Sequence, residues 1–379
     1  MNPIVAEIPA SLIRALHAKR KPTSLDMGLG EPSLMPDMRH FEQAMAWTRE
    51  NGSRYAPNSG FQDLREAIAR HYAYPGYGAG NVCITTGSQE AVFATIKALL
   101  DPARDEVLLV EPLFNVYDKI AQAEGVAVRR VDLGTESGCA FDADAILAAV
   151  TPQTRLIVMC SPCNPTGRVM NKTEAKKLAA GLLARCGSPV YVMHDEIYRE
   201  LTFVDDFCEF GKMYPYTIAI NSLSKSNALT GLRLGWLFAP SDVMAEIVKV
   251  HGWMTSCAST FAQRVALDIF ATNDLAAQRP WYARQKDVAL FAAREAGLEV
   301  IVPDGAFYLC VRVGVGLEEM VSFAESLVDE CDVIAIPGHI FGSSLVGWLR
   351  TSFVGKPEDI REAYRRIAAH AKKYALLPR

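Results

Sequence analysis

The feature that most constrains this fold is a regular alternation of short apolar segments with amphipathic helical segments between residues 60 and 220. The apolar segments are too short for helices and are rich in Val, Ile and Leu, which indicates buried β-strands. They fall at 82–85, 106–110, 126–131, 155–160, 189–194 and 216–220. Apolar strands that alternate with helices are typical of a mostly parallel sheet covered on both faces. We therefore predict an α/β fold.

The pattern changes after about residue 240, where long helical stretches at 241–272 and 277–296 precede a second set of strands. These strands are expected at 298–302, 307–312, 332–336 and 347–353. This part predicts a second, smaller α+β unit. Asn171 followed by Glu174 indicates a helix N-cap with its partner three residues later. A short amphipathic helix is expected near the N-terminus, from the apolar residues Ile8, Leu12, Ile13 and Leu16.

The bulk composition excludes several classes of function. The 379 residues carry a net charge of −4, so no polyelectrolyte partner such as a nucleic acid is expected. The longest stretches without charged residues, 71–89 and 333–349, contain Gly and Pro and do not predict a membrane span. Nine scattered cysteines and no secretory leader favour reduced thiols in the cytoplasm. Cys160 and Cys163 lack a second pair that would complete a zinc site, so no metal is predicted.

Ligands of open α/β sheets bind beyond the carboxyl ends of the strands, so the residues after each predicted strand are the first candidates for a site. Ser88 and Gln89 follow the first strand at a helix start, where free N–H groups and the helix dipole favour a phosphate. Phe114 follows the second strand and offers the flat face of a ring. This edge of the sheet is therefore expected to bind a ligand with a phosphate and a ring.

The later strand ends add an amide, a carboxylate and an amine. Asn164 in SPCNPTG and Asp195 in DEIY each follow a strand, and the segment NSLSKSNALTGLRLG after the last strand carries Lys225. A buried carboxylate needs a cationic partner, and an amine at a strand end is suited to a carbonyl. Pyridoxal phosphate has a phosphate, a flat ring, a basic ring nitrogen and an aldehyde, and so fits this set of residues.

These motifs and their order resemble the class I/II aminotransferases, the fold-type I pyridoxal-phosphate enzymes similar to aspartate aminotransferase. The resemblance runs from Gly30-Glu31-Pro32 to Leu349–Phe353. It implies a seven-stranded sheet in a large cofactor-binding domain at 41–270 and a small α+β domain at 271–379, with which an N-terminal segment, 1–40, packs. It also implies transfer of an amino group between an α-amino acid and a 2-oxo acid.

The resemblance gives the matching residues their chemical roles. It implies that Lys225 forms the aldimine with the cofactor and then moves the proton at the substrate Cα. Asp195 is expected to pair with the ring nitrogen and Phe114 to stack on the ring. Asn164 and Tyr198 are expected to donate hydrogen bonds to the phenolic oxygen, which favours its ionised form.

The same resemblance implies the residues that bind phosphate and substrate. The expected phosphate ligands are Ser88, Gln89, Ser222, Ser224, Arg233 and, from a neighbouring subunit, Tyr55. A tyrosine supplied by a neighbour implies a homodimer with shared active sites. Arg350 is expected to bind the substrate α-carboxylate as a bidentate fork, beside Asn164 and the backbone of Gly30.

Two other functions stay open at this point. Relatives with the same constellation catalyse elimination, cyclisation or oxidation, so a pyridoxal-phosphate lyase, cyclase or oxidase of an amino acid is the alternative. A non-catalytic sensor is disfavoured, because Lys225 is present and only about twenty residues precede the fold. Asn115 and His194 depart from the family pattern, and we interpret His194 as a packed residue. No arginine can be assigned to a second carboxylate of a substrate.

Overall fold

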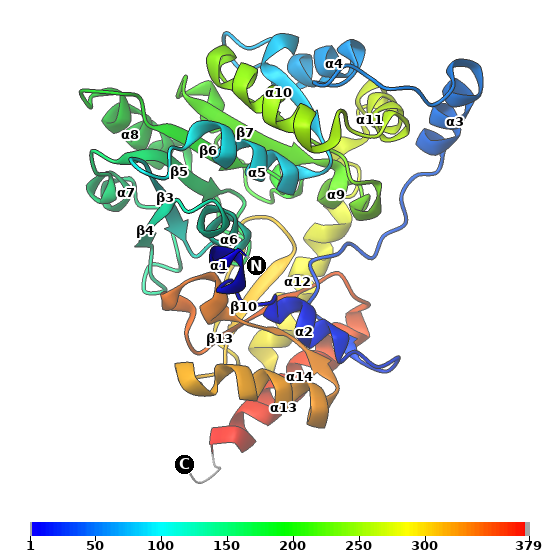
Figure 1. Ribbon diagram of the computed structural model, residues 1–379. Helices are drawn as coiled ribbons and strands as arrows, with labels where there is room; N and C mark the ends of the chain where they lie inside the picture. Colours follow the sequence, from blue (N-terminus) through cyan, green and yellow to red (C-terminus); the bar gives the residue numbers. More distant parts are fainter. Residues whose placement is uncertain (1, 376–379) are drawn as a thin grey trace.

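The computed structural model of the protein describes residues 2–375 and contains a large and a small β-sheet surrounded by helices (Figure 1). The large sheet has seven strands in the order β2-β8-β7-β6-β5-β3-β4. In that order they are Val82–Thr85, Gly235–Phe238, Thr217–Ser222, Tyr191–Asp195, Thr154–Cys160, Glu106–Glu111 and Ala127–Asp132. Neighbouring strands run parallel except at β8, which is antiparallel to β2 and β7. The predicted α/β fold with a mostly parallel sheet is confirmed.

Both faces of the large sheet are buried, as its apolar strands require. In β3, Val107 and Leu109 belong to one buried cluster, whereas Leu108 and Val110 belong to another. The first cluster is completed by α5 (Ser88–Leu99), α6 (Val116–Ala123) and α10 (Ser241–Thr255), and the second by α7 (Ala143–Ala149) and α8 (Lys172–Leu183). A third cluster, with α3 (Arg39–Asn51), α4 (Gln62–Tyr72) and α11 (Thr260–Thr272), covers the end at β2 and β8.

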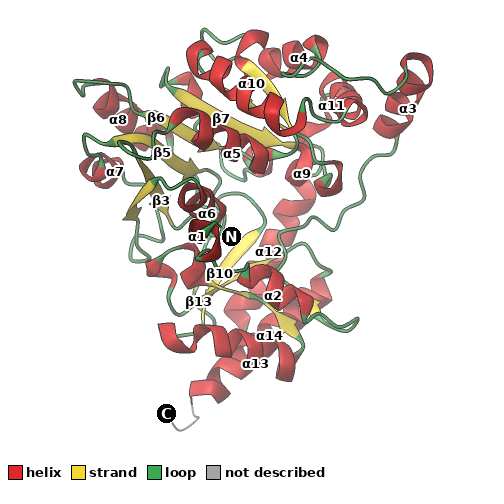
Figure 2. Cartoon of the chain, viewed as in Figure 1, coloured by secondary structure: helices red, strands yellow, loops and turns green. Residues whose placement is uncertain are grey.

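The smaller unit is built on an antiparallel sheet in the order β12-β13-β10-β9, which lies below the large sheet in Figure 2. These strands are Ile336–Pro337, Trp348–Ser352, Tyr308–Arg312 and Val300–Ile301, and their helices are α12 (Arg279–Glu295), α13 (Met320–Cys331) and α14 (Pro357–Ala375). The N-terminal segment joins this unit, because β1 (Leu25–Asp26) pairs with β11 (Val333–Ile334). Within residues 2–375, no helix is both long and apolar enough to cross a membrane. The domain boundaries themselves stay predictions.

The N-terminal segment forms two short helices, α1 (Pro3–Ala6) and α2 (Leu12–Ala18). The predicted amphipathic helix corresponds to α2, in which Ile13 and Leu16 are buried. Ile8 lies outside the helix, because Ser11 caps α2 by accepting a hydrogen bond from the Arg14 N–H.

Local details differ from the sequence prediction where the tertiary structure intervenes. The helical stretch predicted at 241–272 is two helices, because the chain turns at Ser256 with φ 63°. Asn171 caps α8 as predicted, accepting a hydrogen bond from the Glu174 N–H at 2.9 Å. The Glu174 carboxylate, however, accepts from the N–H of Ala143 at 2.7 Å and so ties α8 to α7.

Candidate active site

A cavity of about 530 Å³ lies where the carboxyl ends of the large-sheet strands face the small unit and the N-terminal segment. Every predicted site residue except Ser222 and Tyr55 lines it. These residues are Gly30, Ser88, Gln89, Phe114, Asn164, Asp195, Tyr198, Ser224, Lys225, Arg233 and Arg350. The convergence expected from the order of the strands is thus present in the structure.

Lys225 reaches the cavity from a short helix at the end of β7. The helix α9 (Leu223–Ser226) begins directly after Ser222, whose hydroxyl caps it by accepting from the Ser224 N–H at 3.1 Å. The Lys225 Nζ donates a hydrogen bond to the Gly30 carbonyl at 2.5 Å. Burial, with the nearby positive charges of Arg350 and Arg233, lowers the pKa of Lys225 to about 8. A sizeable neutral fraction near physiological pH makes this amine both a nucleophile and a base.

Asp195 is the last residue of β6 and is only 5% exposed. Its Oδ1 accepts from the Ile197 N–H at 2.9 Å, and its Oδ2 accepts from the Tyr117 hydroxyl. Burial raises the pKa of Asp195, although both hydrogen bonds act in the opposite direction. No lysine or arginine of residues 2–375 lies within ion-pair distance of its carboxylate. The carboxylate therefore faces the cavity with capacity for one more donor.

Tyr117 was not singled out from the sequence, although its position carried a signal. It lies three residues after Phe114 in the same short segment that follows β3, although Phe114 itself precedes α6. Tyr308 of β10 was also missed. Its hydroxyl lies 2.9 Å from that of Tyr198, and a Cβ on Gly30 would overlap it.

Arg350, on β13, is a buried cation without a carboxylate partner. It is 2% exposed, and no Asp or Glu in the described part of the chain lies within 4.0 Å of its guanidinium. Its Nη1 donates to Asn164 Oδ1 at 3.0 Å and its Nη2 to the Gly28 carbonyl, while Nε has no partner. Burying an uncompensated charge costs several kcal/mol. The site is therefore arranged to receive an anion.

A second place for an anion lies at the start of α5. The Arg233 guanidinium approaches so closely that a Cβ on Gly87 would overlap it, and Gly87 has φ 80°. Gly235 lets its own backbone pack closely against the start of α5, since a Cβ on Gly235 would lie 2.7 Å from the Ser88 nitrogen. An arginine thus joins the free N–H groups of a helix N-terminus, and both attract a phosphate.

The two predicted residues outside the cavity have different environments. Ser222 is fully buried, and its hydroxyl is used to cap α9. Tyr55 is 88% exposed and does not line the cavity of its own chain. Asn115 does not line the cavity either; it is the N-cap residue of α6.

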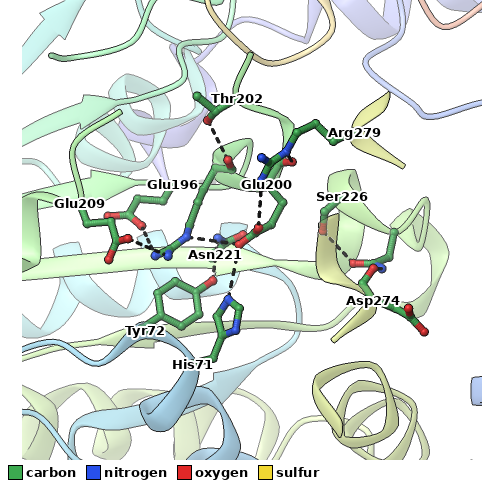
Figure 3. A network of polar contacts seen from close by, with 12 residues as sticks. His71, Tyr72, Glu196, Glu200, Thr202, Glu209, Asn221, Ser226, Asp274 and Arg279 are labelled. Carbon is green, nitrogen blue, oxygen red and sulfur yellow. Dashed lines mark hydrogen bonds and ion pairs between the residues drawn. The ribbon is translucent and has the colours of Figure 1, made fainter. Parts of the chain in front are cut away.

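A buried polar network surrounds Glu196, the residue that directly follows β6 (Figure 3), and Glu196 does not line the cavity. Glu196 has no exposed surface, and its Oε1 lies 2.8 Å from His194 Nδ1. Its Oε2 accepts from the Tyr74 hydroxyl at 2.9 Å and lies 3.4 Å from Arg199. His194 packs against the rings of Phe207 and Phe210, so it lies away from the cavity, as interpreted from the sequence.

Comparisons with known proteins agree with this geometry. The family described as Aminotransferase class I and II matches residues 23–367. The chain is 32% identical to a probable N-acetyl-LL-diaminopimelate aminotransferase of Bacillus subtilis, with 97% of this chain and 94% of that protein covered. It is 31% identical to an aspartate aminotransferase of Pyrococcus horikoshii, with 95% and 94% covered. Among solved structures, aspartate aminotransferase of Thermus thermophilus with maleate superposes with a TM-score of 0.90 at 28% identity, covering 98% of this chain and 99% of that chain.

Proposed function

Since the chain belongs to the class I and II aminotransferases, which move an amino group between an α-amino acid and a 2-oxo acid, we propose that its cavity binds pyridoxal 5′-phosphate. The observation that carries this proposal is the meeting of three unsatisfied groups in one cavity. They are unsatisfied only in the sense that none has a charged partner within 4.0 Å in the described residues: the amine of Lys225, the carboxyl group of Asp195 and the guanidinium of Arg350.

The donors and acceptors of the cavity fit the cofactor. Arg233, Ser224 and the first turn of α5, with Ser88 and Gln89, offer a phosphate several donors. Glu90 is the acid of that turn, but it does not line the cavity and its Oε1 lies 2.6 Å from His251 Nδ1. Asp195 can accept from a protonated ring nitrogen. Phe114 lines the same cavity and would pack against the ring. A side chain at Gly87 or Gly235 would fill the space that this arrangement needs.

We assign the proton transfers to residues of the cavity. Pyridoxal phosphate supplies an aldehyde that bonds reversibly to amines and a ring that accepts electrons from the substrate Cα. Lys225, whose pKa is about 8, would take the proton from Cα and carry it to the cofactor's C4′ carbon. Tyr198 and the Asn164 amide NH₂ would donate to the phenolic oxygen, because Asn164 Oδ1 is already used by Arg350.

Arg350 would hold the α-carboxylate of the substrate. Its guanidinium lies between the rings of Tyr308 and Phe341, 4.5 Å and 4.9 Å from their centroids, and this packing fixes its plane. A fixed guanidinium plane binds a carboxylate in one orientation. The substrate Cα is thereby presented to Lys225 with its amino group toward the cofactor.

The proposal is tested by trapping the cofactor and following the half-reaction. Borohydride reduction of the purified enzyme should leave a pyridoxyl group on the peptide that contains Lys225, as read by mass spectrometry. In a separate sample that has not been reduced, amino acids should bleach the cofactor's absorbance and release the matching 2-oxo acid. A different modified lysine, or a product that has lost its side chain or closed into a ring, would contradict the assignment.

We also propose a homodimer. Several large apolar side chains are exposed in two regions, residues 35–55 and residues 253–254. These regions adjoin each other, because the Gly252 backbone lies against the Asn58 side chain. The exposed side chains include Met35, Met38, Met45, Tyr55, Trp253 and Met254. Trp253 is 91% exposed, which favours coverage by a second copy, and Tyr55 would then reach the phosphate in the neighbour's cavity. Sedimentation should give twice the chain mass, and Tyr55→Phe should weaken cofactor retention; a fully active monomer would rule this out.

The cytoplasm is the proposed location. The odd number of cysteines, all free thiols, favours a reducing compartment. Cell fractionation with a tagged chain tests this, and recovery from an oxidising compartment would contradict it.

A further inference from the structure

Arg14 is a cation of the cavity wall with no role in the chemistry described above. It lines the cavity from α2 and is exposed to solvent, so it lies on the cavity's open side. Within the described residues, no carboxylate lies within 4.0 Å of its guanidinium. Arg14 is thus available to an anion that enters the cavity.

Most other basic residues at this end of the chain behave differently. His17 Nδ1 lies 2.9 Å from Asp26 Oδ2, and the Arg20 guanidinium lies 3.9 Å from the same atom. Lys19 lies 3.4 Å from Asp329. Each of these three side chains therefore has a carboxylate of the protein beside it. Lys21, like Arg14, has none within 4.0 Å among the described residues, but only Arg14 lines the cavity.

The helix that carries Arg14 is held firmly in place. Ile13 and Leu16 are buried in one cluster with Ile334 and Phe341, and the Ser11 hydroxyl accepts from the Arg14 N–H at 3.4 Å. A residue on a packed and capped helix starts from a fixed backbone position, which reduces the entropy lost when its side chain binds a ligand.

The groups beside Arg14 indicate where in the substrate its anion belongs. Phe341 is packed against the Arg350 guanidinium and shares a buried cluster with Ile13, which itself lines the cavity. Phe341 does not itself line the cavity, so Ile13 is the apolar residue that this cluster presents to the cavity, and Arg14 is the next residue along the chain. A substrate bound at Arg350 would extend its methylene groups along Ile13 and present its far end to Arg14.

We propose that Arg14 binds the side-chain carboxylate of the substrate, so that the enzyme prefers acidic amino acids and their 2-oxo acids. This inference rests on the proposed function, because it takes Arg350 as the α-carboxylate site. Glu31 also lines the cavity and would suit a basic side chain instead. Its carboxylate, however, already accepts from the Thr230 hydroxyl at 2.7 Å, whereas no carboxylate occupies Arg14.

Matched substrates and matched variants test this assignment. Glutamate and glutamine differ only in the terminal charge, and so do aspartate and asparagine. We expect Arg14→Gln to lower kcat/KM for the two acids by about 10- to 100-fold, the range for a hydrogen bond to a charged group, and to leave the amides unchanged. Arg14→Lys should restore part of the loss. Arg20→Gln, which removes a nearby arginine that does not line the cavity, should change neither.

A binding measurement separates this inference from the proposed function. Calorimetry on the holoenzyme should show that Arg14→Gln weakens binding of succinate but not of butyrate, which lacks the second carboxylate. Equal succinate affinity in Arg14→Gln and Arg20→Gln would overturn the role of Arg14 even if transamination proceeds. Faster turnover of arginine or lysine than of glutamate would also overturn it. An enzyme that converts no amino acid but binds succinate through Arg14 would refute the proposed function alone.

Discussion

Asp195 and Glu196 are consecutive buried acids that serve opposite faces of the large sheet. Asp195 faces the cavity, where its donors are a hydroxyl and an N–H group, both neutral. Glu196 faces the network behind, where it meets His194 and Arg199, two basic side chains, and the Tyr74 hydroxyl. Burial raises the pKa of Asp195. The same effect acts on Glu196, but its interactions with His194 and Arg199 bring its pKa below the ordinary value of 4.5.

The difference shows that burial alone does not decide what a charged group does. On the network side, each charge has a partner within the protein, and the cluster continues from Arg199 to Glu209 at 2.9 Å. On the cavity side, Asp195 and Arg350 are buried but have no charged partner in the described chain. We expect the two sides to separate experimentally, with cavity residues affecting activity and network residues affecting stability.

The largest effect is expected for Lys225→Ala. Because Lys225 bonds to the cofactor and moves the proton at Cα, kcat should fall by about 10⁴-fold, the upper range for a positioned base. The free energy of unfolding of the cofactor-free protein should not fall, because burying the Lys225 amine costs free energy and the substitution removes that cost. Stopped-flow absorbance and urea titration measure the two quantities. Lys97→Ala, at an exposed lysine paired with Glu124, is the control and should change neither.

Asp195→Asn and Glu196→Gln form the sharpest test of the comparison. We expect Asp195→Asn to reduce kcat by about 10²- to 10⁴-fold, as for loss of an acid–base group, without loss of stability. Glu196→Gln should reduce the free energy of unfolding by up to about 3 kcal/mol, the lower end for breaking a buried ion pair, because Arg199 keeps Glu200 and Glu209 as partners.

The pH dependence of stability should show the contribution of Glu196. Its pKa is lower in the folded state than in the unfolded state, so its stabilisation is present above pH 4.5 and is lost as the pH falls through the folded-state pKa. The difference in stability between wild type and Glu196→Gln should shrink in that range. If Asp195→Asn is the more destabilising change, the division between the two faces is wrong.

A smaller effect is expected on the reactivity of Lys225. In the cofactor-free protein, the rate of reaction with pyridoxal phosphate should rise with pH around a midpoint of about 8. The positive charge of Arg350 contributes to lowering the pKa of Lys225, so Arg350→Gln should move the midpoint upward and slow the reaction at pH 7 severalfold. Tyr198→Phe, which keeps this charge, is the control; an unchanged midpoint in Arg350→Gln would contradict the electrostatic cause.

Most residues of the site could be predicted from the order of the strands and from the residues that follow each strand. Asn164, Asp195 and Lys225 could be placed together from the sequence because parallel strands end at one edge. The strand Gly235–Phe238 was not predicted, since its four residues follow the irregular segment of Arg233 without a helix between. Its apolar run of Trp236, Leu237 and Phe238 was the available signal.

The residues that escaped prediction depend on contacts between distant segments. Tyr117 meets Asp195 across 78 positions of the chain. Arg14 lines the cavity from a helix whose Ile13 and Leu16 share a buried cluster with the distant residues Ile334 and Phe341. The Glu174 carboxylate also makes a contact with a distant segment, because it accepts a hydrogen bond from Ala143 of the neighbouring helix rather than from its own N-cap residue. Spacing along the chain does not encode such contacts.

The finest test exchanges one hydroxyl on each face of the sheet. The Tyr74 hydroxyl donates to Glu196 at 2.9 Å, and the Tyr117 hydroxyl donates to Asp195. Tyr74→Phe should lower the free energy of unfolding by about 1.5 to 3 kcal/mol, the value of a hydrogen bond to a charged group, with kcat unchanged. Tyr117→Phe should instead raise the pKa of Asp195 further, since this bond lowers it.

For Tyr117→Phe, the acid limb of the pH–rate profile should move to higher pH, while the fall in activity at pH 8 stays within severalfold. The two variants remove the same atom from the same residue type, and both acceptors are buried carboxyl groups on adjacent residues. Any difference in stability or activity between the two variants therefore comes from the face of the sheet. Glu196 has its charged partner within the protein, whereas Asp195 would find its charged partner in the ligand. Equal losses of stability, with no shift of the acid limb, would mean that the Tyr117–Asp195 contact is structural.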